Sequence, residues 1–215
     1  KSSLLGDCDI HVIPYGIDTH NFRPMEEGSP QLSETIPNDK FLILTGALDL
    51  NLPRKGVSLL IEALENMSEN IKEEVCLLSF GKGNLQIKGV EAVSLGYLNG
   101  EELIQAYNVA DLFVIPSRQD NLPNTVLEAM ACGTPVIGFD VGGMPDMITH
   151  GLNGYLVKPF DTMSMAEHIS TFVNKNRDKN TNVQFSKNAK TTVLENYALT
   201  KQANNYRKLF ENIVK

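Results

Sequence analysis

The polar segment that follows residues 112–115 carries the side chains best suited to chemistry. It holds two carboxylates, Asp120 and Glu128, which are separated by seven residues. Between them the chain reads Asn121-Leu122-Pro123-Asn124-Thr125-Val126-Leu127. Proline tolerates the first turn of a helix and asparagine is a favoured cap. We therefore expect a helix to begin near Pro123–Thr125, capped by Asn121 or Asn124.

The start of this predicted helix is suited to binding an anion. Unbonded backbone N–H groups and the positive end of the helix dipole meet there, next to the end of an apolar run that is typical of a buried strand. A diphosphate fits such a place. The alternative interpretation is a capped helix in which Glu128 only complements the dipole.

Short apolar runs alternate with amphipathic segments, and these elements must position the helix start. Six runs rich in valine, isoleucine and leucine predict strands at 41–47, 75–80, 92–95, 112–115, 135–139 and 154–157. Helical spacing is present at 57–66, 100–108 and 125–131. The alternation predicts an α/β fold, with a Rossmann-like parallel sheet flanked by helices. Ligands in such sheets bind at the carboxyl ends of the strands.

The composition argues against several classes of protein. With 215 residues, of which 42% are apolar and 21% charged, the chain suits one globular domain. The formal net charge of −7 argues against nucleic acid as a partner, because binding the phosphate backbone requires a basic surface. No run approaches the roughly 20 apolar residues of a membrane-spanning helix. No signal peptide is recognisable.

The cysteines and histidines lack the spacing of a metal site. The three cysteines (Cys8, Cys76 and Cys132) are an odd number, and neither they nor the four histidines are spaced as a ligand set. We therefore expect free, reduced thiols, a cytoplasmic protein and no bound metal.

Three regions are expected along the chain. Residues 1–24 are interpreted as a linker that leads into the domain and as its first strand. Residues 25–175 form the Rossmann-like domain, and residues 176–215 contain two closing helices that pack on it. A polar break at 176–184 precedes these helices. Because the first residue is Lys1 and not methionine, we expect the sequence to be cut from a longer chain.

The segment from Pro116 to Val136 resembles the signature of the retaining GT-B glycosyltransferases often called family 4. The shared features are the two carboxylates, seven residues apart, and the following Ala129-Met130-Ala131-Cys132-Gly133-Thr134-Pro135-Val136. The resemblance implies that Glu128 accepts hydrogen bonds from the ribose of a donor nucleotide. It also implies that Asp120, where the family usually has glutamate, holds hydroxyls of the donor sugar. The backbone of Asn121, Leu122, Pro123, Asn124 and Thr125 would support sugar and phosphate.

Further stretches agree with the family in order and spacing. They are residues 11–24, 54–63, 96–98, 110–117, 141–146 and 151–157, so that the likeness covers about residues 10–172. The first has Tyr15-Gly16 where the family usually has Asn-Gly, and the second contains the Lys55-Gly56 pair that opens a helix. The chain then corresponds to the C-terminal, donor-binding half of a GT-B fold, ending in two closing helices.

The resemblance assigns the remaining site residues. Lys55 would bind the donor diphosphate and, with Asp120, act as a catalytic residue. The family usually adds an arginine after the glycine that ends the first strand, where this chain has Gly46-Ala47. We expect Arg54 to replace part of that charge, the alternative being a solvated surface side chain.

Gly81 would form a tight turn near the nucleotide. Tyr97 and Leu98 would lie along the nucleobase, the alternative for Tyr97 being a packing residue.

The implied reaction is transfer of a sugar from a UDP- or GDP-sugar to an acceptor hydroxyl, with retention at the anomeric carbon and without a cofactor. An N-terminal domain outside this sequence would supply the site for an acceptor glycan or lipid-linked sugar, in surface polysaccharide or glycoconjugate synthesis. That longer protein could contact the inner face of a membrane peripherally. Two rival hypotheses are a non-catalytic nucleotide- or partner-binding module and a sugar-nucleotide epimerase, both of the same fold.

Overall fold

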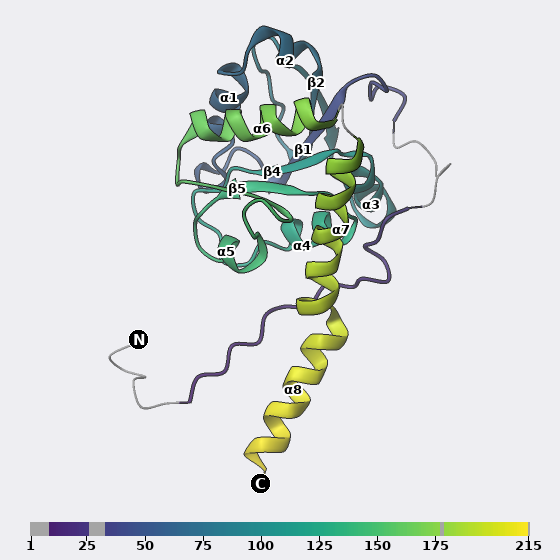
Figure 1. The fold of residues 1–215 in the computed structure, drawn as a ribbon, viewed down its shortest axis with the longest axis vertical. Helices are drawn as coiled ribbons and strands as arrows, with labels where there is room; N and C mark the ends of the chain where they lie inside the picture. Colours follow the sequence, from purple (N-terminus) through teal and green to yellow (C-terminus); the bar gives the residue numbers. More distant parts are fainter. Residues whose placement is uncertain (1–8, 26–32, 177–178, 215) are drawn as a thin grey trace.

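A six-stranded sheet forms the centre of the molecule (Figure 1). The computed structural model describes residues 9–25, 33–176 and 179–214. The strands follow the order β3-β2-β1-β4-β5-β6, and all pairs are parallel. Their bounds are β1 Phe41–Asp49, β2 Val75–Lys82, β3 Glu91–Gly96, β4 Leu112–Ile115, β5 Val136–Phe139 and β6 Gly154–Val157. Each of the six predicted strands is present, with ends shifted by at most two residues.

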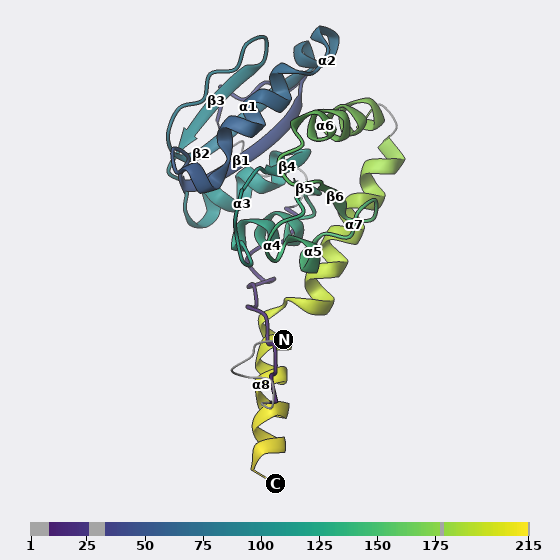
Figure 2. The same cartoon turned by 90° about the vertical axis from the view of Figure 1, so that its left-hand side faces the viewer.

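Helices cover both faces of the sheet (Figures 1 and 2). One face carries α1 (Val57–Glu65), α2 (Glu69–Glu73) and α6 (Thr162–Asn176). The other carries α3 (Gly100–Val109), α4 (Asn124–Ala131), α5 (Met144–Met147) and α7 (Lys179–Asn196). The α/β prediction is therefore confirmed.

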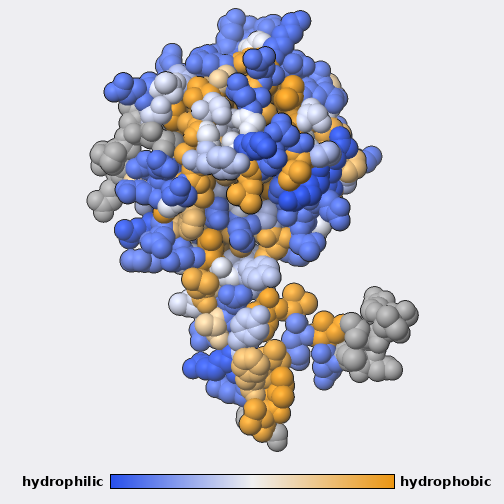
Figure 3. All heavy atoms as spheres, turned by 180° about the vertical axis from the view of Figure 1, so that it is seen from behind, coloured by the Kyte–Doolittle hydropathy of each residue, from blue (hydrophilic) through white to orange (hydrophobic). Residues whose placement is uncertain are grey.

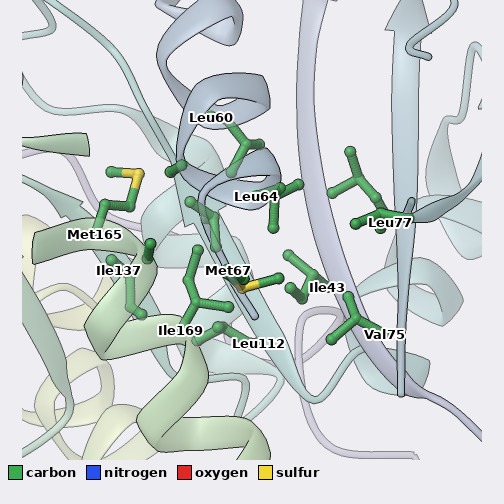
Figure 4. Close-up of a cluster of buried hydrophobic side chains, with 14 of the residues drawn as sticks. Ile43, Leu60, Leu64, Met67, Val75, Leu77, Leu112, Ile137, Met165 and Ile169 are labelled. Atoms are coloured by element: carbon green, nitrogen blue, oxygen red, sulfur yellow. The ribbon is translucent and has the colours of Figure 1, made fainter. Parts of the chain in front are cut away.

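Period-two alternation along the strands explains why there are two cores. Ile43 and Leu77 belong to one buried cluster, whereas Leu44 and Leu78 belong to the other. Successive side chains of a strand point to opposite faces, so a strand covered on both sides is apolar throughout. Figure 4 shows the first cluster, in which Leu60 and Leu64 of α1 lie near Ile43 of β1 and Leu77 of β2, with Met165 and Ile169 of α6 beside them.

Four helices differ from the expected pattern. The sequence analysis did not predict α2, α5 or α6, and most of the polar break expected at 176–184 belongs to α7, which begins at Lys179. The later turns of α7 explain why this helix includes most of the polar break. Phe185, Ala189 and Val193 are buried at helical spacing, and the helix packs against α4 and α6. This packing stabilises a helix whose first residues are polar.

The segment before the domain pairs with the junction between the last two helices. Where a first strand is expected within residues 1–24, the described part has an isolated bridge between Ile17 and Ala198. Ile17 N donates to the carbonyl oxygen of Tyr197, and Leu199 N donates to that of Ile17. The segment before the domain is thus joined to the junction of α7 and α8 (Leu199–Ile213), not to the sheet.

The last helix was expected to pack on the domain, and it does not. No residue of α8 is buried, and the helix extends away from the rest of the molecule (Figures 1 and 2). In the described part of the chain, no helix combines the length and apolar character needed to cross a bilayer. Cys76 and Cys132 are buried free thiols, as expected, while Cys8 lies outside the described residues.

Candidate functional site at the switch point of the sheet

The switch point of the sheet lies between β1 and β4. The chain continues from β1 to β2 and β3 on one side, and from β4 to β5 and β6 on the other. Loops that leave the carboxyl ends of strands in opposite directions form a crevice for ligands. The loop after β1 contains the short 3-10 helix η1 (Pro53–Lys55), and the loop after β4 leads to α4. Lys55 and Asp120 lie on these two loops.

Backbone contacts hold the two loops together. Arg118 N donates to the carbonyl oxygen of Arg54 at 2.8 Å. Gly56 has the left-handed φ of 65°, and a Cβ there would lie 1.9 Å from the carbonyl oxygen of Pro116. Glycine is required at position 56 for both reasons. The sequence Lys55-Gly56 therefore sets the lysine directly against the loop after β4.

A third loop, after β5, supports the segment that carries Asp120. Gly143 N donates to the carbonyl oxygen of Asp120 at 3.3 Å. A Cβ at Gly142 would lie 1.8 Å from that same oxygen, and one at Gly143 would lie 1.7 Å from the carbonyl oxygen of Asn121. Because only glycine permits backbones to approach so closely, these two residues fix the position of the Asp120 loop.

Lys55 and Asp120 form an ion pair. The Lys55 Nζ donates to the Asp120 Oδ2 at 2.8 Å, and the two side chains are only 18% and 16% exposed. A hydrogen bond between two charged groups is stronger than one between neutral groups, and partial burial reduces screening by salt. The pair therefore holds the ammonium group at the crevice.

A cavity of about 390 Å³ opens beside this pair. It is lined by Tyr15, Arg54, Lys55, Asp120, Leu122, Pro123, Asn124 and Thr125. All of these residues except Tyr15 were predicted from the sequence as site residues. The structure thus brings together a lysine, an arginine, a carboxylate and the first residues of a helix.

The start of α4 faces this cavity without a side-chain cap. The cap position is Pro123, so the expected capping by Asn121 or Asn124 was wrong. In the described part of the chain, no oxygen accepts a hydrogen bond from the backbone N–H of Asn124 or Thr125. A proline cannot cap through its side chain, which leaves these donors to a ligand or to solvent. Together with the helix dipole, they favour an anion.

Glu128 lies one turn further along α4 and is not part of the cavity lining. Its Oε2 accepts a hydrogen bond from the hydroxyl of Tyr107 at 2.8 Å. Burial raises the pKa of the Glu128 carboxyl, and the Tyr107 hydrogen bond opposes that rise. The carboxylate is thus close to the helix start, but the structure connects it to α3.

The other predicted residues lie outside the cavity lining. Gly81 at the end of β2 has φ 102°, and its backbone meets that of Ala47. Tyr97 follows β3 and is 64% exposed, while Leu98 is partly buried against the second core. Asn121 is exposed and contributes the carbonyl oxygen that meets Gly143. These residues lie at the carboxyl ends of strands or on the loops that follow them, but they do not line the cavity with Lys55.

Arg54 and Ala47 stand at the two positions considered, besides Lys55, for a positive charge near the diphosphate, and they differ in their surroundings. Arg54 is exposed and lines the cavity beside Lys55. Ala47, at the place where the family usually has an arginine, is 6% exposed and packs in the first core. The cavity therefore takes its positive side chains from Lys55 and Arg54.

Two tyrosines at or beside the site were not predicted from the sequence. Tyr15 lines the cavity and is 70% exposed, and Tyr107 hydrogen-bonds to Glu128. For Tyr15 the signal was its place before a glycine in a stretch that resembles the family. For Tyr107 the sequence gives no signal, because a tyrosine at an inward position of a helix looks like a packing residue.

Two larger cavities, of about 550 and 570 Å³, lie at the opposite edge of the sheet. Asp111 lines both, and residues that precede β1, β4 and β5 surround it. We place the site at the smaller cavity, because the ion pair and the start of α4 converge only there among the cavities described. In the described residues, no group of three or more histidine, cysteine, aspartate or glutamate side chains could hold a metal ion.

Comparison with known proteins identifies the family to which the matched residues are similar. The family described as "Glycosyl transferases group 1" matches residues 39–175. The sulfoquinovosyl transferase SQD2 of Arabidopsis thaliana is 32% identical over 169 residues, which are 74% of this chain and 32% of the relative.

Solved structures share the fold. The sucrose-phosphate synthase tll1590 of Thermosynechococcus elongatus matches 95% of this chain and 52% of its own, with a TM-score of 0.77 and 25% identity. Alr3699/HepE of Anabaena, in complex with UDP and glucose, matches 95% of this chain and 56% of its own, with a TM-score of 0.72 and 19% identity. This chain spans about a third to a little over half of the length of these three proteins.

Proposed function

Because this chain belongs to the group 1 glycosyl transferases and has the fold of a C-terminal GT-B domain, we propose that it binds the donor of a sugar transfer. The donor is a nucleoside-diphosphate sugar held by its diphosphate. The transfer goes to an acceptor hydroxyl and retains the configuration of the anomeric carbon.

One observation carries this proposal. Lys55, Arg54 and the uncapped start of α4 line one cavity at the switch point. When the bond between sugar and diphosphate breaks, negative charge grows on the leaving diphosphate. A preorganised cation and helix N–H groups stabilise that charge more in the transition state than in the ground state. Lys55 is therefore the residue that we expect to contribute most to the reaction.

Asp120 has two tasks in this proposal. Its Oδ2 accepts from the Lys55 ammonium, and its carboxylate lines the cavity. A carboxylate has four acceptor positions, so it can keep Lys55 in place and also accept from hydroxyls of the donor sugar. Glu128 would accept from the ribose. The two carboxylates do not act as the acid and base of a glycosidase, because that mechanism requires an activated water and a raised acid pKa.

We propose UDP or GDP as the nucleotide, and no metal or other cofactor. The UDP and UDP-glucose complexes of Anabaena Alr3699/HepE, a protein of the same fold, support a uridine nucleotide. An N-terminal domain would supply the acceptor site, for a glycan or lipid-linked sugar in polysaccharide or glycoconjugate synthesis, with peripheral contact to a membrane. The chain by itself should then bind donor weakly and transfer little or no sugar.

Isothermal titration calorimetry with UDP and GDP tests the proposal. Wild-type protein should bind at least one of them. Lys55→Ala should weaken binding by about tenfold or more, since a buried charged hydrogen bond is worth roughly 1.5–3 kcal/mol. Lys88→Ala, which removes an exposed lysine from the turn before β3, is the matched control and should bind like wild type. Absence of binding by both nucleotides in a folded protein would refute the site.

One observation favours a second candidate, a non-catalytic module of the same fold. Ala47 is buried and carries no charge where the family usually has an arginine. A module that only binds nucleotide needs less stabilisation of the leaving group. Turnover of UDP- or GDP-sugars by the protein together with an N-terminal domain would exclude this candidate, whereas nucleotide binding without turnover would support it.

A further inference from the structure

Tyr107 of α3 is fully buried, and its hydroxyl donates to Glu128 Oε2 at 2.8 Å. Among the described residues, Tyr107 is the one hydrogen-bond donor to the Glu128 side chain. The bond joins α3 to α4 one turn after the helix start that faces the cavity. The direction of the Glu128 carboxylate is therefore set by a residue outside the loop that carries Asp120.

The Tyr107 ring cannot easily move. Phe22, Phe80 and Phe113 each contact it edge-on, with centroids 6.4, 5.9 and 5.6 Å away. Its own carbonyl oxygen accepts from the Thr134 Oγ1 at 2.6 Å, which fixes the backbone as well. Edge-to-face aromatic contacts stabilise such an arrangement, and a buried ring has few alternative rotamers. The hydroxyl thus points in one direction.

The protonation states of Tyr107 and Glu128 suit a fixed direction of the hydrogen bond, from the Tyr107 hydroxyl to the Glu128 carboxylate. Burial, the Glu128 charge and the hydrogen bond to it hold the Tyr107 pKa well above its ordinary value, so the phenol stays protonated and donates. Burial also raises the pKa of Glu128, whereas the hydrogen bond from Tyr107 favours its ionised form. The other titratable neighbour is Cys132, which directly follows α4, and burial raises its pKa to about 12, so it stays neutral.

We propose that Tyr107 is a positioning residue for the nucleotide. Its hydroxyl holds one oxygen of the Glu128 carboxylate, so that the ionised group meets the ribose of the donor in one orientation. This inference rests on the proposed function, because it takes Glu128 as the acceptor for the ribose. It adds that the ribose contact depends on a hydroxyl in the core of the domain.

A purely structural role of Tyr107 would lie in its ring. Tyr107→Phe keeps the ring and its three aromatic contacts and removes only the hydroxyl. Tyr197→Phe is the matched control, because it also removes a buried tyrosine hydroxyl, which donates to the carbonyl oxygen of Asp146 away from the cavity. Thermal unfolding of both variants checks that each is folded.

The decisive measurement is the pH dependence of UDP-glucose affinity between about pH 5 and pH 8. UDP-glucose is the probe because its diphosphate keeps a constant charge in that range. Without the hydroxyl, the pKa of Glu128 rises further and the carboxylate takes up its proton at a higher pH. Affinity of Tyr107→Phe should therefore decline at a higher pH than that of wild type, and be about tenfold weaker near pH 6.

Two results would overturn the inference. In the first, Tyr107→Phe has the affinity and pH profile of wild type while Glu128→Ala has lost binding. In the second, Glu128→Gln retains the acid-side decline of wild type, so that Glu128 does not cause it. This second variant keeps the inference testable if Tyr107→Phe does not fold. Failure of the proposed function would be seen differently, because wild type would then not bind UDP or GDP, or Lys55→Ala would bind as tightly as wild type.

Discussion

At the scale of single residues, two partly buried carboxyl groups have pKa values raised by burial. Glu128 lies beside the candidate site, and Asp111 lies at the opposite edge of the sheet, before β4. The Asp111 Oδ2 accepts from Leu42 N at 2.8 Å, which attaches the start of β4 to the start of β1. Burial nevertheless dominates and raises the pKa of Asp111 to about 6.

The raised pKa of Asp111 predicts a stability change with pH. Its pKa is about 6 in the folded protein and 3.8 as the ordinary value. Between these values the folded state binds a proton that the unfolded chain has released, so the free energy of unfolding should rise as pH falls from about 6 towards 4, by up to roughly 3 kcal/mol. Asp111→Asn should lack this slope.

Urea denaturation at several pH values measures the Asp111 effect. Asp39→Asn, which removes an exposed carboxylate from the same edge of the sheet, is the control and should retain the wild-type slope. The prediction fails if wild type and Asp111→Asn differ by a constant free energy over the whole range. In that case the carboxylate does not take up its proton in the folded state near pH 6.

At the scale of elements, the position of Asp120 depends on the loop after β5. Gly143 has φ −91°, which any residue adopts, so the objection to a side chain there is steric. Gly143→Ala would place a methyl group 1.7 Å from the carbonyl oxygen of Asn121, and the Asp120 loop would have to move. We expect a loss of about 1–3 kcal/mol in stability, as for overpacking, and of most UDP affinity.

Gly151→Ala is the control that separates the loss of stability from the loss of UDP affinity. Gly151 has φ 78°, and an added methyl group meets nothing within 4 Å, so this variant suffers the backbone cost alone. It should lose stability but bind UDP like wild type in calorimetry. Unchanged UDP affinity of Gly143→Ala would show that this contact does not set the position of Asp120.

The strands and the charged residues of the site could be predicted from the sequence, because both depend on local patterns. Strands buried on both faces are continuous apolar runs, and their ends were predicted to within two residues. Gly56 and the helix start indicated the strand-end face for Lys55, and the structure adds its ion pair with Asp120, which the sequence did not predict. The site assignment itself stays a prediction until nucleotide binding is measured.

What sequence reasoning missed depends on contacts between distant elements. The bond from Tyr107 to Glu128 joins residues 21 positions apart, and no local pattern encodes it. The helix start at Pro123 also differs from the capping preference of asparagine, and the loop before it contacts Gly142 and Gly143, which lie about 20 positions further along the chain. Likewise α7 begins in a polar stretch because later turns pack on α4.

At the scale of the whole molecule, the described chain consists of a three-layered domain, with the sheet between two layers of helices, and one protruding helix. The helix α8 begins at the bridge between Ile17 and Ala198 and extends away from the sheet (Figure 2). Its exposed apolar residues are Leu199, Tyr206, Phe210 and Ile213. Figure 3 shows apolar side chains gathered along this protruding part. None of them contributes to either core.

This separation predicts that the domain folds without α8. Removing residues 203–215 deletes no side chain that is buried among the described residues 203–214 and preserves both hydrogen bonds of Ile17, so the melting temperature should fall by less than about 2 °C. Val193→Ala, in the buried face of α7, is the contrasting variant and should cost about 1–3 kcal/mol, which is several degrees. Differential scanning calorimetry compares the two. If the truncation lowers the melting temperature as much as Val193→Ala does, then α8 is part of the cooperative unit, and its exposed face must contribute to the stability of the folded domain.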